Sequence, residues 1–479
     1  MRGKLRPRGR RVKHVTRVLI VTGSELGTRM AGPAIRALAM ARVLTADGHQ
    51  VVLATTSRLD ADAVAAGSDT PVQFEMTHVR PGDRAGFARL ERAAEIIVFQ
   101  GHAMEQFPAL ARTDRVVVAD AYDPMHLEML EQGKEKPRGE WDYLVSSRVR
   151  LLNQQLTRAD LVLCASQRQR TLYLGQLASL GRISPATYEN DPHAQRLLAV
   201  APFGLDPVPP RHDRPALRGV VDGIGDNSRI ALWGGGLYQW FDPLTLIRAV
   251  HALAQRDPRV VLVFLGTAHP GVDAMGIVRE SYDLAQQLGA LGTSVIFNGD
   301  WVPFAQRGAF YAEATAGVST HHAHLETEFS FRTRILDYLW AGLPMVVTEG
   351  DSFADLVAQQ ELGVVVPAND QAALEAALER VLCDDAFAEA CRARVAQVRD
   401  EFAWEVTLAP LRELARNPRR AADVERAGGR ARLARSLRAV HRAPLPPGVR
   451  RDALMAAHYL RHGGLTELKA RLATRRAKG

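Results

Sequence analysis

The chain has 479 residues, of which 47% are hydrophobic and 24% charged, a composition typical of a globular protein with two or three domains. No apolar run approaches the roughly 18–20 residues that span a bilayer, and the apolar piece after the basic N-terminus is too short for a signal-peptide core. Cys164, Cys383 and Cys391 show neither metal-ligand spacing nor a disulfide framework, which favours a reducing cytoplasm.

The net charge of +8 is concentrated at the two ends of the chain. Residues 1–13 hold seven Lys and Arg and no acid, and residues 411–479 hold 18 Lys and Arg against five Asp and Glu. The body between them is therefore net negative. Basic ends attract phosphate-rich partners, either anionic membrane lipid or nucleic acid. The alternative is that both ends are solvated tails without a partner.

Strands and helices alternate from residue 17 to about residue 400. In the first half, apolar runs predict strands at 17–23, 50–56, 95–101, 115–120, 159–166 and 198–204, with a helix at 34–49. Continuous apolar strands separated by helical sequence indicate a parallel sheet that is covered on both faces.

A segment rich in Pro, Gly and Asp interrupts this alternation of strands and helices, which indicates an interdomain linker. The pattern then restarts, with strands expected at 229–235, 259–266, 294–300, 316–322, 345–351 and 363–370. Helices are expected at 242–256 and 278–291, before Gly342, and up to Leu382. A terminal helix at about 396–416 has Phe402, Trp404 and Leu408 as its apolar anchors.

These patterns predict an α/β fold with two tandem Rossmann-like domains, each built on a parallel sheet. The expected division is a basic N-terminal segment (1–16), a first domain (17–207), a linker (208–228), a second domain (229–395), a crossing helix (396–416) and a basic helical tail (417–479). The tail has two Arg- and Ala-rich stretches that could lie on an anionic membrane or pack on the body.

The stretch ETEFSFRTRILDYLWAGLPMVVT, residues 326–348, contains a short helix with an unusual start. Gly342 and Pro344 are its stop signal, and Ser330 or Thr333 is the expected cap. Arg332 and Arg334, however, lie at this same start. A helix N-terminus is electropositive and prefers acids by roughly 0.3–1 kcal/mol per charge. Two cations at this place therefore suggest a bound anion.

Glycines follow several strands at the edge where ligands bind in open α/β sheets. Gly23, Gly27 and Gly32 follow the first strand and precede a helix whose first turn holds Arg36. Their spacing differs from the dinucleotide fingerprint, so a plain turn is the alternative. In the second half, the strand ends carry Gly234, Gly235, Gly236 and Gly266. Three consecutive glycines are costly in backbone entropy, which suggests that a ligand approaches the backbone there.

Asp120, Asp123, His126 and Glu128 follow the strand at 115–120. Such a cluster could contact substrate, or its acids could simply form the turn before Pro124. A metal–diphosphate site is a weaker interpretation, because Asp120 and Asp123 are three residues apart and no further ligand cluster accompanies them.

Several segments resemble GT-B glycosyltransferases, specifically glycosyltransferase family 4. The resembling segments are GPAIRALAMARVLTADGHQVVLATT, VAPFGLD, WGGGLYQWFDPLTLIRAV, SVIFNGDW, EFSFRTRILDYLWAGLPMVVT and LGVVVPANDQAALEAAL. The resemblance covers roughly residues 17–410 and implies the GT-B fold, in which the parallel sheets of the two Rossmann-like domains face each other across a cleft. Gly236 and Phe241 stand where many family members have an Arg and a Lys. The family's paired glutamates, eight residues apart, become Glu328 and Asp337, nine apart.

The resemblance implies transfer of a sugar from a nucleotide-diphosphate sugar to an acceptor hydroxyl, with retention, without metal and without a further cofactor. Arg332 and Arg334 would stabilise the leaving diphosphate in place of the absent glycine-loop cations. The alternative is that they pair with Glu326 and Glu328.

The resemblance assigns roles to the other candidates as well. Asp337 would bind the ribose and Glu328 the sugar hydroxyls. The glycine loops with Gly234, Gly235, Gly236 and Gly266 would bind the donor, and Asp300 and Trp301 would lie near the nucleobase. Gly32 and Arg36 would face the diphosphate from the first domain. Asp120, Asp123 and His126 would contact the acceptor.

We therefore predict a glycosyltransferase that acts in cell-envelope glycan or glycolipid synthesis. It would be cytoplasmic and peripheral at the inner face of the membrane, where its basic ends would bind. A non-catalytic binding or scaffold protein with the same fold is the alternative. The acidic body and the lack of interleaved aromatic and basic residues argue against nucleic acid as a partner.

Overall fold

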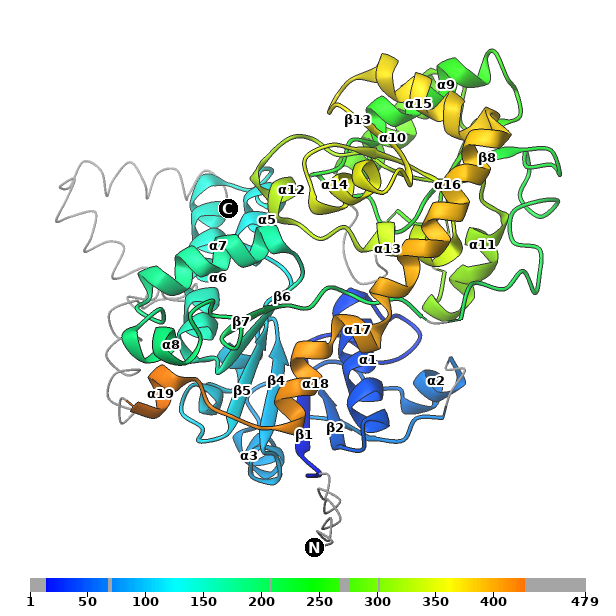
Figure 1. Ribbon diagram of the computed structural model, residues 1–479. Coiled ribbons are helices and arrows are strands. Elements are labelled where there is room, and N and C mark those ends of the chain that lie inside the picture. Colours follow the sequence, from blue (N-terminus) through cyan, green and yellow to red (C-terminus); the bar gives the residue numbers. More distant parts are fainter. Residues whose placement is uncertain (1–13, 68–70, 207, 268–275, 300–301, 427–479) are drawn as a thin grey trace, which may run out of the picture.

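The computed structural model describes residues 14–67, 71–206, 208–267, 276–299 and 302–426. Two parallel sheets, each covered by helices, form a lower and an upper domain (Figure 1). This is the GT-B-like arrangement of two α/β units that the sequence predicts.

The first sheet has seven parallel strands in the order β3-β2-β1-β4-β5-β6-β7. They are β1 (Arg17–Thr22), β2 (Gln50–Thr55), β3 (Glu75–His78), β4 (Ile96–Gln100), β5 (Val116–Asp120), β6 (Leu161–Cys164) and β7 (Leu198–Val200). Six of them are at the predicted places. The edge strand β3 was missed, because its four residues are mostly polar and only partly buried.

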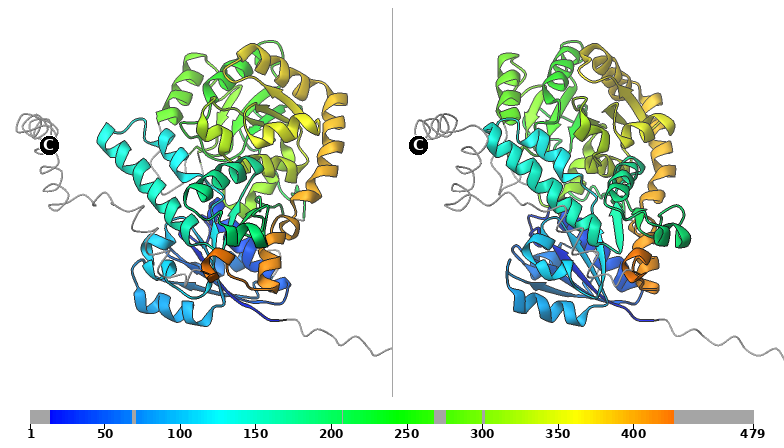
Figure 2. Two further views of the ribbon diagram at one scale, coloured as in Figure 1. Left: turned by 60° about the vertical axis from the view of Figure 1, so that its left-hand side comes forward. Right: turned by 90° about the vertical axis from the view of Figure 1, so that its left-hand side faces the viewer.

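The helices of the first domain are α1 (Gly32–Ala46), α2 (Ala61–Ala66), α3 (Arg84–Ala93), α4 (Ala103–Gln106), the 3₁₀ turn η1 (Pro108–Ala111), α5 (Met125–Gln132), α6 (Arg138–Arg158), α7 (Gln167–Ser179) and α8 (Pro185–Asn190). Helices α5 and α6 rise from the first domain toward the second (Figure 2). Helix α5, which follows β5 in the chain, contacts α12 (Leu325–Phe329) of the second domain.

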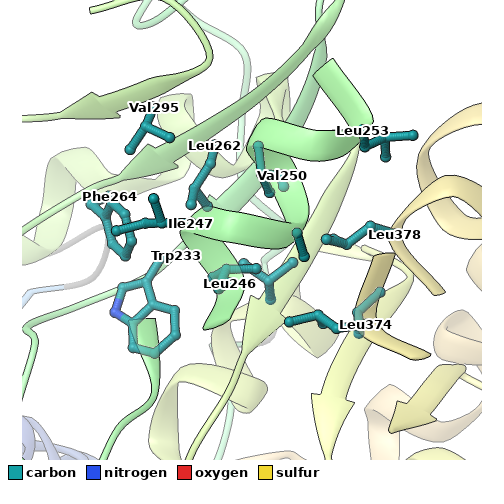
Figure 3. Close-up of a cluster of buried hydrophobic side chains, with 14 of the residues drawn as sticks. Trp233, Leu246, Ile247, Val250, Leu253, Leu262, Phe264, Val295, Leu374 and Leu378 are labelled. Atoms are coloured by element: carbon teal, nitrogen blue, oxygen red, sulfur yellow. The ribbon is translucent and has the colours of Figure 1, made fainter. Parts of the chain in front are cut away.

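The second sheet has six parallel strands in the order β10-β9-β8-β11-β12-β13. They are β8 (Arg229–Trp233), β9 (Val260–Phe264), β10 (Val295–Phe297), β11 (Ala316–Ser319), β12 (Met345–Thr348) and β13 (Gly363–Val366), all at predicted places. All five side chains of β9 are buried, as expected for a strand with helices on both faces. One such face packs Trp233, Leu262 and Phe264 against α9 and α15 (Figure 3).

The helices of the second domain are α9 (Pro243–Ala254), α10 (Gly276–Gln287), the 3₁₀ turn η2 (Phe304–Gln306), α11 (Arg307–Glu313), α12 (Leu325–Phe329), α13 (Thr333–Ala341), α14 (Ser352–Gln359), α15 (Gln371–Cys383) and α16 (Asp385–Val398). Helix α9 begins at the signals expected for a helix start. The Asp242 side chain accepts a hydrogen bond from Thr245 N at 3.0 Å, and Pro243 occupies the first turn.

The crossing segment is not the single helix that was predicted at 396–416. Helix α16 ends at Val398 and is followed by η3 (Arg399–Phe402), α17 (Trp404–Thr407) and α18 (Ala409–Arg416). Ala403 interrupts the helix because its backbone is not helical, with φ −55° and ψ 138°. Leu408, one of the predicted anchors, is fully buried in the first domain, so the segment crosses from the second domain to the first (Figure 1).

After α18 the chain continues along the first domain to α19 (Ala422–Arg426). Ala421 N donates to Asp160 Oδ1 at 3.0 Å, and Arg182 Nε lies 2.6 Å from Asp423 Oδ2. The start of the predicted basic tail is therefore packed on the body, while most of that tail and the basic residues 1–13 lie outside the described residues. Within the described ranges, no helix is both long and apolar enough to cross a membrane.

Candidate active site

The three glycines after β8 form a turn at the carboxyl end of the second sheet. Gly235 has φ +88°, a conformation that favours glycine. Gly234 N donates to Tyr338 Oη at 3.0 Å, and a Cβ atom on Gly234 would lie 2.1 Å from Tyr311 Oη. The nearest neighbour of a Cβ atom on Gly266 would be the Gly235 backbone, at 4.0 Å. The close approach to Gly234 is thus made by a tyrosine of the same domain.

Arg334 lies against this turn, and no acid among the described residues pairs with its positive charge. Its Nη2 donates to Gly236 O at 2.9 Å, and its guanidinium carbon lies 4.1 Å from the Trp233 ring centre and 4.0 Å from that of Phe241. The side chain is 8% exposed, and its Nη1 is buried without a hydrogen-bond partner. Burial lowers the pKa of Arg334 to about 10. The site therefore holds a desolvated cation that an anion would stabilise.

Arg332, two residues earlier, is neutralised by the protein itself. Its Nη1 and Nη2 donate to the two oxygens of Glu326 at 2.9 and 2.7 Å, and Nη2 also contacts Thr327 Oγ1 at 3.2 Å. Both partners of the pair are buried. The predicted alternative, in which one of the two arginines pairs with Glu326, therefore holds for Arg332.

The start of α13 is also without a side-chain cap. Its N-cap residue is Arg332, not Ser330 or Thr333 as predicted, and no side chain there accepts a hydrogen bond from the first turn. The predicted end is confirmed, because Gly342 is left-handed with φ 69°. An uncapped helix start beside the unpaired Arg334 suits an anionic ligand.

Asp337 lies one turn further along α13 and is already engaged. Its Oδ1 accepts from Arg307 Nε at 3.1 Å, and its Oδ2 accepts from Tyr311 Oη at 3.2 Å. The Arg307 guanidinium lies 3.5 Å from the Phe304 ring centre and 4.3 Å from that of Trp340. Asp337 keeps a side-chain exposure of 29%, so a ligand hydroxyl can still reach it.

Glu328 is placed apart from this group, on the exposed face of α12. The buried carboxylate of α12 is Glu326, which the sequence suggested only as a partner for the arginines. Among the described residues, no hydrogen bond or ion pair joins Glu328 to Arg334, although the two were predicted together as catalytic residues.

Arg36 and Asp120 do not face a diphosphate or an acceptor. The Arg36 side chain is fully buried, and its Nε and Nη2 donate to the Asp120 carboxylate at 2.8–3.0 Å. Its remaining donors reach Ala201 O and Pro202 O. The two candidates are thus corrected to a buried structural ion pair, which ties α1 to β5. Gly32 is the first residue of α1 and lies beside the ring of Phe203.

Asp123 and Glu128 form a carboxyl pair at the end of β5 and the start of α5. Burial raises the pKa of Asp123 to about 6, with a contribution from Glu326. Burial and the Asp123 carboxyl raise the pKa of Glu128 well above its usual value. His126, also on α5, has a pKa lowered by burial, and its Nδ1 has no partner. Two of the three acceptor candidates, Asp123 and His126, are thus on the side of the first domain that approaches α12.

Asp300 and Trp301 lie outside the described residues. Among the described residues, no group of three or more His, Cys, Asp or Glu side chains could hold a metal ion. Two cavities, of about 540 and 190 Å³, are both in the first domain, one beside α3 and η1 and one beside α8 and α19. Neither is lined by the candidate residues, so the geometry around Arg334 is the better guide to the site.

Residues 228–384 match the family model described as glycosyl transferases group 1. The protein carries a group 1 glycosyltransferase domain. The match includes the glycine turn, Arg334 and Asp337. No curated protein matches the chain significantly.

Solved structures share the fold of this glycosyltransferase at low sequence identity. Sucrose-phosphate synthase from Thermosynechococcus elongatus is 17% identical with a TM-score of 0.56, covering 84% of this chain and 98% of its own. HepE from Anabaena, solved with UDP-glucose, is 15% identical with a TM-score of 0.58, covering 84% and 99%. WaaG, a glycosyltransferase involved in lipopolysaccharide biosynthesis, is 17% identical with a TM-score of 0.55, covering 86% and 100%.

Several residues of the candidate site were not predicted from the sequence. Tyr338 is four positions after Arg334, so helical spacing could have placed the two on one face. Tyr311 and Arg307 lie on a different helix, α11, and no local pattern connects them with Asp337 or Gly234. Their role follows from the packing of α11 against α13.

Proposed function

We propose that this enzyme transfers a glycosyl group from a nucleoside-diphosphate sugar to a hydroxyl group of an acceptor. The observation that carries the proposal is the buried guanidinium of Arg334, which lies against the glycine turn with one nitrogen unpaired. HepE, which has a similar fold, was solved in complex with UDP-glucose, which supports a donor of this type.

In the reaction, the bond between the anomeric carbon and the diphosphate breaks, and the leaving diphosphate takes the bonding electrons. A new bond forms between that carbon and the acceptor oxygen, whose proton passes to the leaving diphosphate. Arg334 would stabilise the negative charge that develops on the diphosphate, because a fixed donor in a dry site needs no reorganisation. Arg332 would hold Glu326 and the start of α13 in place.

The other donor contacts follow the resemblance to family 4. Asp337 would bind the ribose hydroxyls, in the orientation that Arg307 and Tyr311 impose. Glu328 would meet the sugar only if α12 moves on binding. We keep retention of configuration and a mechanism without metal as parts of the proposal, because the family resemblance implies both.

We also propose that residues 17–207 form the acceptor domain and residues 229–395 the donor domain, joined by the linker 208–228. Asp123 and His126 would contact the acceptor, a glycan or lipid-linked glycan of the cell envelope. The basic ends of the chain would hold the enzyme at the inner face of the membrane.

A thermal-shift screen against UDP-, GDP-, ADP-, TDP- and CMP-sugars tests the donor site. A donor present at about 100 times its dissociation constant should stabilise the enzyme by roughly 2.7 kcal/mol. Arg334→Met should weaken binding by roughly 10- to 100-fold, since a hydrogen bond to a charged group contributes about 1.5–3 kcal/mol. The unliganded variant should melt no lower than the native enzyme, because Met fills the apolar surroundings and removes an unpaired charge.

Arg392→Met is the matched control. Arg392 is a half-buried arginine of the same domain that donates to Thr315 O at 2.8 Å, away from the glycine turn. It should leave donor binding unchanged. Full donor binding by Arg334→Met would disprove the assignment of the diphosphate site.

A non-catalytic binding protein is the second candidate, because Glu328 is exposed and the glycine turn lacks cations of its own. Turnover separates the two. Release of nucleotide from the stabilising sugar donor supports the enzyme, and tight binding without any hydrolysis or transfer supports the binding protein.

A further inference from the structure

Gln169 connects the two domains at the junction where the donor and acceptor segments meet. It lies on the first turn of α7, in the first domain, and is completely buried. Its Nε2 donates to Tyr122 O of the first domain at 2.8 Å and to Phe329 O of the second domain at 2.9 Å. Both hydrogens of this one amide group are thus used, one in each domain.

The orientation of the amide is determined by the start of α7. Ser166 Oγ caps the helix by accepting from Gln169 N at 3.1 Å, and Gln169 Oε1 accepts from Ala165 N at 2.7 Å. A backbone N–H can only donate, so the oxygen of the amide must face Ala165. The nitrogen must then face the two carbonyl groups, which can only accept. This arrangement is a variant of the capping box, with its amide nitrogen left for the interdomain contact.

The two carbonyl groups belong to the segments that the proposed reaction needs to align. Tyr122 immediately precedes Asp123 of the acceptor side. Phe329 is the last residue of α12, three positions before Arg332 and five before Arg334 of the donor side. Next to Gln169, Arg168 donates to Gly350 O and to Asp355 of the second domain. The start of α7 therefore contacts the donor domain at several points.

We propose that Gln169 is a positioning residue that holds the donor and acceptor segments in register. This inference rests on the proposed function, because it assumes that the two segments bind the two substrates. Gln169 does not touch the substrates. It acts through the Tyr122 and Phe329 carbonyl groups. A loss of register between the domains should slow turnover of the donor, to water as well as to an acceptor, and leave the affinity for the nucleotide within the second domain unchanged.

Gln169→Glu is the sharpest test, because Glu keeps the oxygen that accepts from Ala165 N and replaces the donating nitrogen with a second oxygen. This oxygen would face two carbonyl oxygens and repel them. We expect UDP-glucose hydrolysis to fall at least tenfold, while the dissociation constant for UDP changes less than about twofold. The defect relative to the native enzyme should shrink as the pH falls, because a protonated Glu can donate to one carbonyl group.

Gln167→Glu is the matched control, with the same change two positions away at an exposed site of the same helix. It should leave hydrolysis and UDP binding unchanged. Gln169→Met serves if Gln169→Glu folds poorly, since Met keeps the volume without any donor. Both variants at position 169 should also increase the radius of gyration in small-angle X-ray scattering, as the domains separate.

Native hydrolysis together with a native radius of gyration in a folded variant at position 169 would overturn the inference. Failure of the proposed function gives a different result. In that case the native enzyme neither binds UDP nor hydrolyses UDP-glucose or other nucleotide sugars, and the scattering comparison still tests whether Gln169 holds the domains together.

Discussion

Arg332 and Arg334 are chemically identical side chains that the fold places in different surroundings. Two cations at the start of a helix suggest an anion, but the sequence does not tell which of them is free. Glu326 pairs with Arg332 through two hydrogen bonds, whereas Arg334 donates to the carbonyl oxygen of Gly236. At the scale of residues, the fold pairs Arg332 with an acid and leaves Arg334 without one among the described residues, which is why the diphosphate site is proposed at Arg334.

The carboxyl pair of Asp123 and Glu128 predicts a pH dependence of stability. Burial raises the pKa of Asp123 from 3.8 to about 6, so the folded protein keeps a proton that the unfolded chain has lost over this interval. The contribution of protonated Asp123 to the free energy of unfolding is fully present below about pH 4 and is lost as the pH rises through about 6. The side chain of Asp123→Asn stays neutral at every pH. The melting temperature of this variant should therefore fall less than that of the native protein between about pH 4 and pH 7.

The exposed Asp62 provides the control for this measurement. Asp62→Asn should show the native pH dependence of melting in differential scanning calorimetry. Parallel pH curves for Asp123→Asn and the native protein would show that Asp123 does not titrate in this way.

At the scale of elements, α13 and the crossing segment both depart from their local sequence patterns. Helix α13 ends at Gly342 as predicted, but it begins without a capping side chain. The crossing segment was predicted as one helix, and Ala403 breaks it where the chain passes between domains. In both places contacts with other segments decide the local structure, since Arg332 at the start of α13 pairs with Glu326 and Leu408, beyond Ala403, packs into the first domain.

The turn at Gly234 gives a prediction at this scale. A Cβ atom on Gly234 would lie 2.1 Å from Tyr311 Oη, so Gly234→Ala must displace α11 or the turn. We expect a loss of about 1–3 kcal/mol in the free energy of unfolding, measured with urea. Adding Tyr311→Phe should recover part of it, because the hydroxyl oxygen is the closest atom.

Gly139→Ala is the matched control, since a Cβ atom there would meet nothing within 4 Å. It lies in α6 and should be neutral or stabilise by up to about 1 kcal/mol. An equally small effect of Gly234→Ala, or no coupling to Tyr311→Phe in the double-mutant cycle, would contradict the packing of Tyr311 against the turn.

At the scale of the whole molecule, the C-terminal segment joins the two domains and then follows the first. It ends, within the described residues, at the buried ion pair of Arg182 and Asp423, whose side chains are 4% and 10% exposed. A chain that stops at residue 416 should lose about 3 kcal/mol of unfolding free energy compared with a chain that stops at residue 426, because Arg182 stays buried without its acid. Urea denaturation of the two chains measures this difference.

Full-length Asp423→Asn isolates the ion pair and should reproduce most of the loss. The chain that stops at 426 should keep its donor binding but lose its attachment to anionic liposomes, if residues 427–479 contact the membrane as proposed. Equal liposome binding by this chain and the full-length protein would contradict the membrane role of the tail.

The sequence by itself determined the α/β fold, the presence of two tandem α/β units and the class of enzyme. Apolar runs such as those of β8 and β9 indicate buried strands. The segment around Arg334 and Asp337 resembles the glycosyltransferase family 4 signature within a few consecutive residues. Such signals are local, so they can be read along the chain. The missed strand β3 is the case in which the local signal is weak.

Only the tertiary structure decided which of the candidate residues are available to a ligand. Arg36 and Asp120 are 84 positions apart, and they lose their predicted roles because the fold pairs them in the core. Gln169 and Phe329 are 160 positions apart, and their contact connects the domains. Burial and partners arise from packing between distant segments, and a charge becomes available to a ligand only where that packing leaves it unpaired, as it does at Arg334.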